Sequence, residues 1–128
     1  MDNYKNRERS ARQLRFGENL RKAISLVLQN YSFHDPIIDD STLIITEVRV
    51  SPDLSNASVY IIIMGNSGNN QELVSTINDK FRKLVGPLTR ELKLRRAPKI
   101  KFIYDDSIER QSQIDKLIEK AKNNNFSS

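Results

Sequence analysis

The sequence predicts an α+β fold in which a three-stranded sheet carries its helices on one face. Three segments alternate apolar with polar residues and are rich in β-branched side chains, as strands are. Four other segments space apolar residues three and four positions apart, which is typical of amphipathic helices. The chain has 128 residues, 38% of them hydrophobic, and no cysteine, so a single domain can bury a core without disulfides.

The first helix is predicted over about residues 11–31, with Ser10 as a suitable N-cap. Gly17 lies inside this segment and is expected to weaken the helix by about 1 kcal/mol relative to alanine. The polar residues 1–7 that precede it are expected to be flexible. One apolar stripe is expected to face the core, formed by Leu14, Leu20, Ile24, Val27, Leu28 and Tyr31.

Two strands are predicted over residues 42–50 and 57–64, after a loop at 32–41. Residues 51–56 read Ser-Pro-Asp-Leu-Ser-Asn, which is turn chemistry, and so short a connection predicts an antiparallel hairpin. A sheet covered mostly on one side, with some cover on the other, is expected, because one face of the second strand is fully apolar and the other partly apolar. The two faces of that strand carry Ala57, Val59, Ile61 and Ile63 on one side and Tyr60, Ile62 and Met64 on the other.

A helix, a break and a second helix are predicted between the second and third strands. Residues 71–85 have helical spacing, and Gly86-Pro87 interrupts it because proline lacks the N–H that a helix needs. A short second helix is expected over about 87–94, since proline is favoured in a first helical turn. Ala97-Pro98 ends the helical region, and residues 100–104 alternate as the third strand.

The last helix is predicted over about residues 107–122, capped by Asp105-Asp106-Ser107, and residues 123–128 are expected to be a flexible polar tail. Its core side is expected to be Ile114, Leu117, Ile118 and Ala121. The chain is therefore predicted to be a single domain over 1–128, ordered over about 8–122. The order α-β-β-α-(kink)-α-β plus a C-terminal helix is like that of a type II KH domain, a fold that clamps nucleotide backbones at a GXXG loop between paired helices.

Positive charge is concentrated in 22 positions between the second helix and the third strand. The chain has 21 basic and 16 acidic residues, a net charge of +5. This segment has nine basic residues and one acid, Glu91, so it carries +8 and the other 106 residues sum to −3. The segment predicts a docking surface for a nucleic acid, whereas the alternative is a solvated face of lysine and arginine. Its basic residues are Lys80, Arg82, Lys83, Arg90, Lys93, Arg95, Arg96, Lys99 and Lys101.

The position of the KH loop departs from the classical motif. It offers Val85-Gly86-Pro87-Leu88, which has no second glycine. A literal GXXG occurs at residues 65–68, but it joins a strand to a helix, where a flexible turn is the simpler interpretation.

Catalytic and metal sites are not indicated. The only histidine, His34, sits beside Asp35 in a loop with no nucleophile at a recognisable spacing. Asp39-Asp40 and Asp105-Asp106 are interpreted as turn and cap residues. No Walker loop, dinucleotide fingerprint or zinc spacing is present, so we expect no enzyme activity, cofactor, metal or small-molecule substrate. No run reaches the roughly 20 apolar residues of a membrane span and no secretory signal precedes the fold, so a cytoplasmic protein without a membrane partner is expected.

Three segments in the same order resemble the ribosome-binding factor A family of bacterial small-subunit assembly proteins. The most specific is the Ser-x-Asp-Leu-x-x-Ala-x-Val-Tyr pattern of residues 51–60. Residues 92–107 are similar to the family's Leu-x-Leu-Arg-x-x-Pro-x-Leu-x-Phe-x-x-Asp-x-Ser, with Ile100 at the last leucine position. The resemblance spans roughly residues 8–120. The third segment is the first helix, with Arg15, Glu18, Leu20, Arg21, Ile24, Ser25 and Leu28.

Two departures from the family pattern fall at the interhelical kink. The family usually has Ala-x-Gly there, whereas Leu84-Val85-Gly86 keeps only the glycine, and proline follows. Matching both Gly86 and Pro98 to the family implies a deletion of about four residues, near one helical turn.

The resemblance implies a non-enzymatic factor that binds the free 30S small ribosomal subunit. It would assist late maturation of 16S rRNA in its 5′-end region and support growth in the cold, as a monomer with the 30S subunit and 16S rRNA as partners. Gly86 would let the rRNA backbone come close. The alternatives are a KH-like RNA- or DNA-binding module not dedicated to ribosomes and a protein-interaction module whose charge serves solubility. Phosphate contacts are expected from Arg82, Lys83, Arg90, Lys93, Arg95, Arg96 and Lys101.

Overall fold

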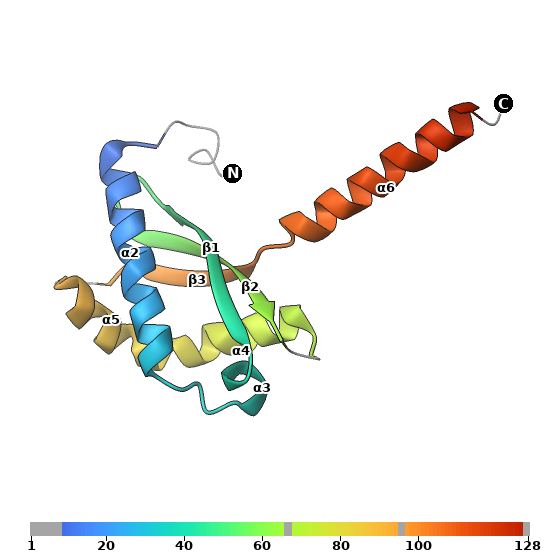
Figure 1. The fold of residues 1–128 in the computed structure, drawn as a ribbon. Helices are drawn as coiled ribbons and strands as arrows, with labels where there is room; N and C mark the ends of the chain where they lie inside the picture. Colours follow the sequence, from blue (N-terminus) through green and yellow to red (C-terminus); the bar gives the residue numbers. More distant parts are fainter. Residues whose placement is uncertain (1–8, 66–67, 95–96, 127–128) are drawn as a thin grey trace.

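The computed structural model describes residues 9–65, 68–94 and 97–126 and confirms the predicted α+β class (Figure 1). The helix–strand order expected for a type II KH-like fold is also confirmed, with one short helix added. The elements are α2 (Ala11–Asn30), α3 (Pro36–Asp39), β1 (Thr42–Val50), β2 (Asn56–Met64), α4 (Asn70–Phe81), the 3-10 turn η1 (Arg82–Leu84), α5 (Val85–Leu92), β3 (Lys99–Tyr104) and α6 (Ser107–Phe126).

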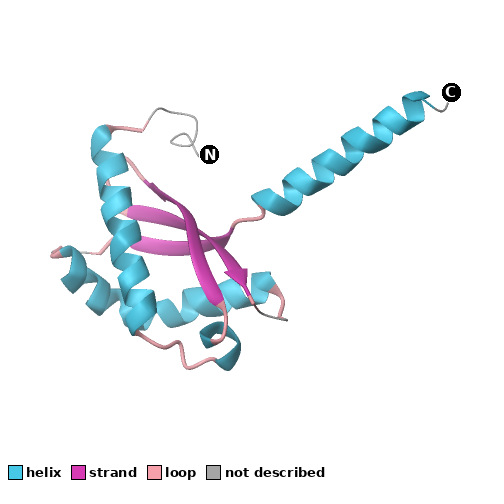
Figure 2. Ribbon diagram, viewed as in Figure 1, coloured by secondary structure: helices cyan, strands magenta, loops and turns pink. Residues whose placement is uncertain are grey.

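The sheet has the strand order β1-β2-β3 (Figure 2). The predicted hairpin is confirmed, because β1 and β2 pair antiparallel, with a bulge between Ile45 and Glu47. β2 and β3 pair in parallel, which requires the crossover that α4, η1 and α5 supply. On the covered face, Val59 lies beside Phe102, and both are buried with side chains of α2, α4 and α5 in one cluster. The helices cover mostly one face of the sheet, as predicted (Figure 1). On the opposite face Met64 and Lys101 are exposed, whereas Tyr60 and Ile62 are partly buried.

α2 begins at Ser10, where a capping box confirms the predicted N-cap: Gln13 N–H donates to Ser10 Oγ, and Ser10 N–H donates to Gln13 Oε1. The predicted core stripe is only partly right. Leu20, Ile24 and Val27 are buried and Leu28 packs against the core, but Leu14 and Tyr31 are 52% and 44% exposed. Gln13, Gly17 and Ala23 are buried instead. This side of the helix faces the sheet, where Gln13 Nε2 donates to Val50 O at 3.0 Å.

Gly17 has a packing role that helical spacing alone does not reveal. A Cβ at this position would lie 3.4 Å from Val48 O and 3.5 Å from Val50 Cγ2. At Gly17, α2 therefore packs closely against the backbone of β1, with room for a Cβ only at van der Waals contact. Glycine remains costly in a helix interior, so this packing sets against that cost a close contact of helix and strand.

The loop predicted at residues 32–41 contains the short helix α3. Asp35 caps it, since its Oδ1 accepts from the N–H groups of Ile37 and Ile38, and Pro36 occupies the first helical position. Ile38 is buried and anchors the helix in the core. The Asp-Pro pair is a helix start signal as well as a loop signal, and here the buried Ile38 favours the helix.

The break between α4 and α5 lies earlier than predicted. The helix gives way at η1, and α5 already begins at Val85, so Gly86 and Pro87 lie in its first turn and not at the break. Proline is tolerated there because the first N–H groups of a helix have no partner within the helix. α5 ends at Leu92, two residues before the predicted end, where Lys93 adopts a left-handed conformation with φ of 54°.

The turn at residues 51–56 is confirmed as a tightly hydrogen-bonded unit. Asp53 Oδ1 accepts from Ser51 Oγ, Ser55 Oγ and Ser55 N. Asn56 N donates to Ser51 Oγ, and Leu54 takes a left-handed φ of 62°. The most specific sequence pattern in the chain therefore builds a rigid hairpin connection.

α6 begins at Ser107 as predicted, but it projects away from the body of the domain (Figure 1). Its expected core side is wrong: Ile114, Leu117 and Ile118 are 48%, 66% and 50% exposed, and Ala121 is exposed as well. The helix also continues to Phe126, so residues 123–126 are helical where a flexible tail was expected. The expectations for residues 1–7 and 127–128 lie outside the described residues. Among the helices that the structure describes, none is long and apolar enough to cross a membrane.

Candidate nucleic-acid interface

Four cations and one glycine form a row along η1 and α5, which we name the basic stripe: Arg82, Lys83, Gly86, Arg90 and Lys93. From Lys83 onwards, each member lies three or four positions from the next, so they share one side of the helical segment, and Arg82 borders it. Leu84 and Leu88 are buried in the core. Burial of these leucines therefore orients the stripe towards solvent.

Gly86 makes a gap in the middle of the stripe. A Cβ built on it would meet only Arg90 Nη1, at 3.7 Å, which is ordinary contact distance. Its φ is not among the positive ones, so neither space nor backbone conformation requires a glycine here. The guanidinium of Arg90 thus lies beside a bare stretch of backbone.

Lys93 sets the end of the stripe. Its N–H donates to Arg90 O at 3.2 Å, and Leu94 N–H donates to Thr89 O at 3.2 Å, which closes the helix. The left-handed conformation of Lys93 turns the chain away from α5 at this point. A cation at a helix C-terminus also interacts favourably with the helix dipole.

The cations of the stripe are free of carboxylate partners in the described part of the chain. The ion pairs found there join Arg9 and Arg49 to Glu47 and Arg110 to Asp106. Cations without an ion-pair partner, gathered on one side of a helix, are available to phosphate groups.

The structure does not bring Lys101 together with the stripe. Phe102 is buried against Phe81 of α4, with ring centroids 4.8 Å apart, so its neighbours along β3 face the other way. Lys99 and Lys101 are exposed, and Lys101 lies beside Ser58 on the open face of the sheet. The basic segment is therefore divided between two faces of the domain. Two further predicted contacts, Arg95 and Arg96, lie outside the described residues.

Lys80 is engaged within the fold. Its Nζ donates to Phe33 O at 2.9 Å and to His34 O at 3.4 Å. These hydrogen bonds connect α4 to the loop that follows α2. Lys80 therefore has a structural role and is not a free cation.

The candidate acids are held as turn and cap residues, as predicted. Asp39 accepts from Phe33 N and Ser32 Oγ, and the Ser32 bond above all lowers the pKa of its carboxyl. Asp105 accepts from Thr46 Oγ1 and Ser107 N, which lowers its pKa and starts α6. No group of three or more potential metal ligands occurs within residues 9–65, 68–94 and 97–126.

The glycine pair at residues 65–68 follows β2 and precedes α4, as expected for a turn. Gly65 has a φ of 80°, which favours glycine. The two middle residues lie outside the described part, and the motif stands at the start of α4, away from the junction of α4 and α5.

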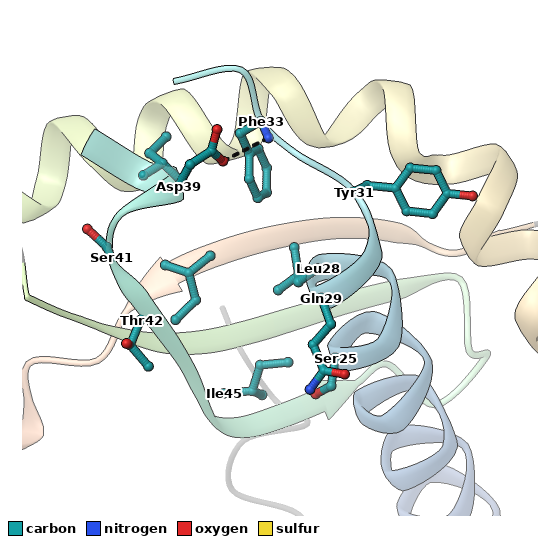
Figure 3. Close-up of a pocket in the computed structure, with 11 residues that line it drawn as sticks. Ser25, Leu28, Gln29, Tyr31, Phe33, Asp39, Ser41, Thr42 and Ile45 are labelled. Carbon is teal, nitrogen blue, oxygen red and sulfur yellow. Dashed lines mark hydrogen bonds between the residues drawn. The ribbon is translucent and has the colours of Figure 1, made fainter. Parts of the chain in front are cut away.

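A hollow of about 370 Å³ lies between the end of α2 and β1 (Figure 3). Leu28 and Ile45 contribute apolar surface, and Ser25 and Thr42 contribute hydroxyl groups. Its lining residues include no cation, and the one carboxylate among them, Asp39, is bonded to Phe33 N–H. Its chemistry gives no match to a polyanion.

Sequence reasoning missed one feature beside the stripe. Tyr31 and His34 line a second hollow with Lys83, at the junction of the α2–α3 loop and η1. Helical spacing predicts Tyr31 in the core, because the residue continues the apolar stripe of α2. The available signal was the loop composition Tyr-Ser-Phe-His-Asp-Pro, in which two aromatics and a histidine follow the last helical turn.

Comparison with known proteins gives consistent matches. The family model described as Ribosome-binding factor A matches residues 12–118. A ribosome-binding factor A of Phenylobacterium zucineum is 36% identical over 113 residues, covering 88% of this chain and 77% of the relative. A ribosome-binding factor A of Rhodopseudomonas palustris is 36% identical over 110 residues, covering 85% of this chain and 79% of the relative.

Solved structures point the same way. The crystal structure of ribosome-binding factor A from Thermus thermophilus superposes with a TM-score of 0.57 at 25% identity, covering 72% of this chain and 94% of that one. A homology model of Thermus thermophilus ribosome-binding factor A, fitted into the cryo-EM map of its complex with the 30S subunit, superposes with a TM-score of 0.54 at 26% identity. The match covers 70% of this chain and 91% of that one. The solution structure of a putative ribosome-binding factor A of Thermotoga maritima superposes with a TM-score of 0.60 at 24% identity, covering 75% of this chain and 89% of that one. At this identity the match shows a likeness of fold alone.

Proposed function

The chain belongs to the ribosome-binding factor A family, and from this we propose that it binds the free 30S ribosomal subunit through its 16S rRNA. The observation that supports an RNA contact is the basic stripe, a row of cations without ion-pair partners that the buried Leu84 and Leu88 direct outwards. A family relative from Thermus thermophilus has been fitted into the map of a 30S complex.

The finer proposal is that the protein assists late maturation of 16S rRNA in its 5′-end region and supports growth in the cold. It acts by binding and not by catalysis. Arg82, Lys83, Arg90 and Lys93 neutralise phosphates, which supplies affinity without reading sequence. The folded shape of the rRNA then selects the site. Holding an immature rRNA segment against a rigid surface favours one of its competing conformations, and such conformations are trapped longest at low temperature.

Gly86 has a separate part in the proposal. Between Lys83 and Arg90 the stripe has no side chain, so a phosphate can approach the backbone there and be held by a cation on each side. Lys101 would contact a different stretch of rRNA, because it lies on the open face of the sheet. Arg95 and Arg96 are also proposed as phosphate contacts, and this proposal rests on the sequence alone.

The test compares two double substitutions that change net charge equally. Lys83→Glu with Lys93→Glu alters the stripe, and Lys99→Glu with Lys101→Glu alters β3. We expect the stripe variant to weaken binding to purified 30S subunits. It should also flatten the plot of log affinity against log salt by about 0.7–0.9 units for each phosphate that the variant no longer neutralises. The β3 variant should lose at most one phosphate contact, that of Lys101. Equal weakening in both variants would show that charge alone, and not the stripe, governs binding.

Competition separates the ribosomal proposal from its rivals. A general RNA-binding module would bind an unrelated structured RNA as tightly as it binds 30S subunits at the same salt concentration. A protein-interaction module would bind neither RNA, even at low salt. The 30S proposal requires a clear preference for free 30S subunits over assembled ribosomes and over unrelated RNA.

The maturation step is tested in cells. A strain lacking the protein should accumulate 16S rRNA with an unprocessed 5′ end, more so in the cold, and the normal chain should reverse this. The Lys83→Glu, Lys93→Glu variant should fail to do so at equal abundance. Full rescue by that variant would separate maturation from the stripe.

A further inference from the structure

The hollow at the start of the stripe is lined by both ring-bearing and cationic side chains. It lies between the α2–α3 loop and η1 and encloses about 310 Å³, near the lower end of the range for small-ligand sites, about 300–1,000 Å³. Tyr31 and His34 line it from the loop, and Lys83 lines it from η1. Lys83 also belongs to the basic stripe, so the hollow and the stripe are continuous.

The loop that carries Tyr31 and His34 is fixed from two sides. From α3, Asp39 accepts hydrogen bonds from Phe33 N at 3.1 Å and from Ser32 Oγ at 2.7 Å. From α4, Lys80 donates to the carbonyls of Phe33 and His34. These bonds hold the loop in one shape before any ligand arrives, which lowers the entropy that binding would cost.

Both ring-bearing residues face solvent and not the core. Tyr31 is 44% exposed, and although it borders the hollow between α2 and β1 as well, its ring points away from the centre of that hollow (Figure 3). His34 is exposed and has a φ of 56°, so the backbone accepts a left-handed conformation at the residue that lines the hollow. Phe33, between them in the loop, is buried and anchors it.

We propose that this hollow binds one unstacked nucleobase of single-stranded RNA, with Tyr31 stacking on the base, His34 bonding its edge and Lys83 contacting the adjoining phosphate. Sequence-tolerant recognition of single strands uses this combination of an aromatic platform and a neighbouring cation. The proposal rests on the proposed function, because it supplies a base contact at one end of the phosphate-binding stripe. It predicts that the protein engages a single-stranded segment there.

The experiment uses the full chain and three substitutions of Tyr31. We expect Tyr31→Ala to weaken binding to 30S subunits by about 5- to 150-fold, the range expected for removal of one stacked base. The salt dependence should not change, because stacking releases no counterions. Tyr31→Phe keeps the ring and should bind like the unmodified protein. Tyr31→Trp introduces the only tryptophan of the chain, and its fluorescence should be quenched by a mixed-sequence single-stranded RNA decamer.

The outcomes distinguish the base site from the stripe. Weak binding by Lys83→Glu with Lys93→Glu, together with normal binding by Tyr31→Ala, would overturn the base site and leave the proposed function intact. Normal binding by both variants would overturn both. Tryptophan quenching by an abasic decamer of the same length, equal to that by the complete RNA, would also contradict base stacking. Thermal unfolding of Tyr31→Ala controls for loss of fold, which is not expected for a side chain so exposed.

Discussion

Asn78 of α4 pairs with the backbone of Phe102 on β3 through both ends of its amide. Its Nδ2 donates to Phe102 O at 2.9 Å, and its Oδ1 accepts from Phe102 N at 2.7 Å. β3 is an edge strand, so these backbone groups would otherwise need another strand or water. The amide therefore fastens α4 to the sheet beside the Phe81–Phe102 ring contact.

Asn78→Ala is expected to destabilise the fold by about 1–3 kcal/mol, because it leaves the partly buried N–H of Phe102 without its partner. Urea unfolding followed by circular dichroism measures the change. Asp79→Ala, at the exposed neighbouring position, is the control and should stay within about 0.5 kcal/mol. Equal, small effects of both substitutions would mean that water replaces the amide without cost.

This pair shows where prediction from sequence stops. The helical spacing at residues 71–85 identifies a helix, but no local pattern indicates that one of its amides meets a strand 24 positions away. Strand bounds and the Ser10 cap are predictable because they depend on neighbouring residues. The predicted Gly86-Pro87 break is wrong because proline is allowed in a first turn, and only packing of Leu84 and Leu88 decides where that turn begins.

The same limit applies to surfaces. α6 has apolar residues at helical spacing, yet spacing shows which residues share a face and not whether another element covers it. The division of the basic segment could have been anticipated, since Lys99 and Lys101 alternate with Phe102. For the second hollow, the loop composition indicates only which side chains the α2–α3 loop supplies. It does not indicate that this loop meets η1 across about 50 residues of intervening chain.

Acid should destabilise the hairpin turn through Asp53. Hydrogen bonds within the turn, led by that from Ser55 Oγ, lower the pKa of Asp53 from 3.8 to about 2. A carboxyl whose pKa is lower in the folded state contributes stability above its unfolded value, and this contribution is lost as pH falls through the folded value. Asp53→Asn should therefore be less stable than the unmodified protein above about pH 4, and the difference should shrink as pH falls to about 2.

Urea unfolding of both proteins at several pH values from about 2 to 7 measures this difference. Glu119→Gln, which removes one exposed carboxylate from α6, is the control for removal of a single negative charge outside the turn. A difference between Asp53→Asn and the unmodified protein that stays constant down to about pH 2 would contradict a role for the ionised carboxylate.

Removing α6 should leave the domain nearly as stable as before. A chain ending at Asp106 loses the Tyr104–Glu109 hydrogen bond and the Asp106–Arg110 ion pair, and the α6 side chains whose burial the structure describes, residues 107–124, are all exposed. Exposed contacts of this kind contribute little, so the free energy of unfolding should change by less than about 0.5 kcal/mol. Urea unfolding of the shortened chain measures it. A decrease of about 2 kcal/mol or more would mean that Leu117 and Ile118 pack against the domain in solution.

Gly86→Ala should separate stability from RNA binding. The added methyl group meets only Arg90 Nη1 at contact distance, and alanine favours the helix by up to about 1 kcal/mol, so unfolding in urea should need more denaturant. If a phosphate lies against the bare backbone, the same methyl group holds it off. Affinity for 30S subunits should then fall by about tenfold, the equivalent of one charge-assisted hydrogen bond. Thr89→Ala, also on α5, is the matched control for binding. A Gly86→Ala protein that is more stable and binds as tightly as before would exclude close approach of the rRNA backbone at this position, while leaving the phosphate contacts of Lys83 and Arg90 in place.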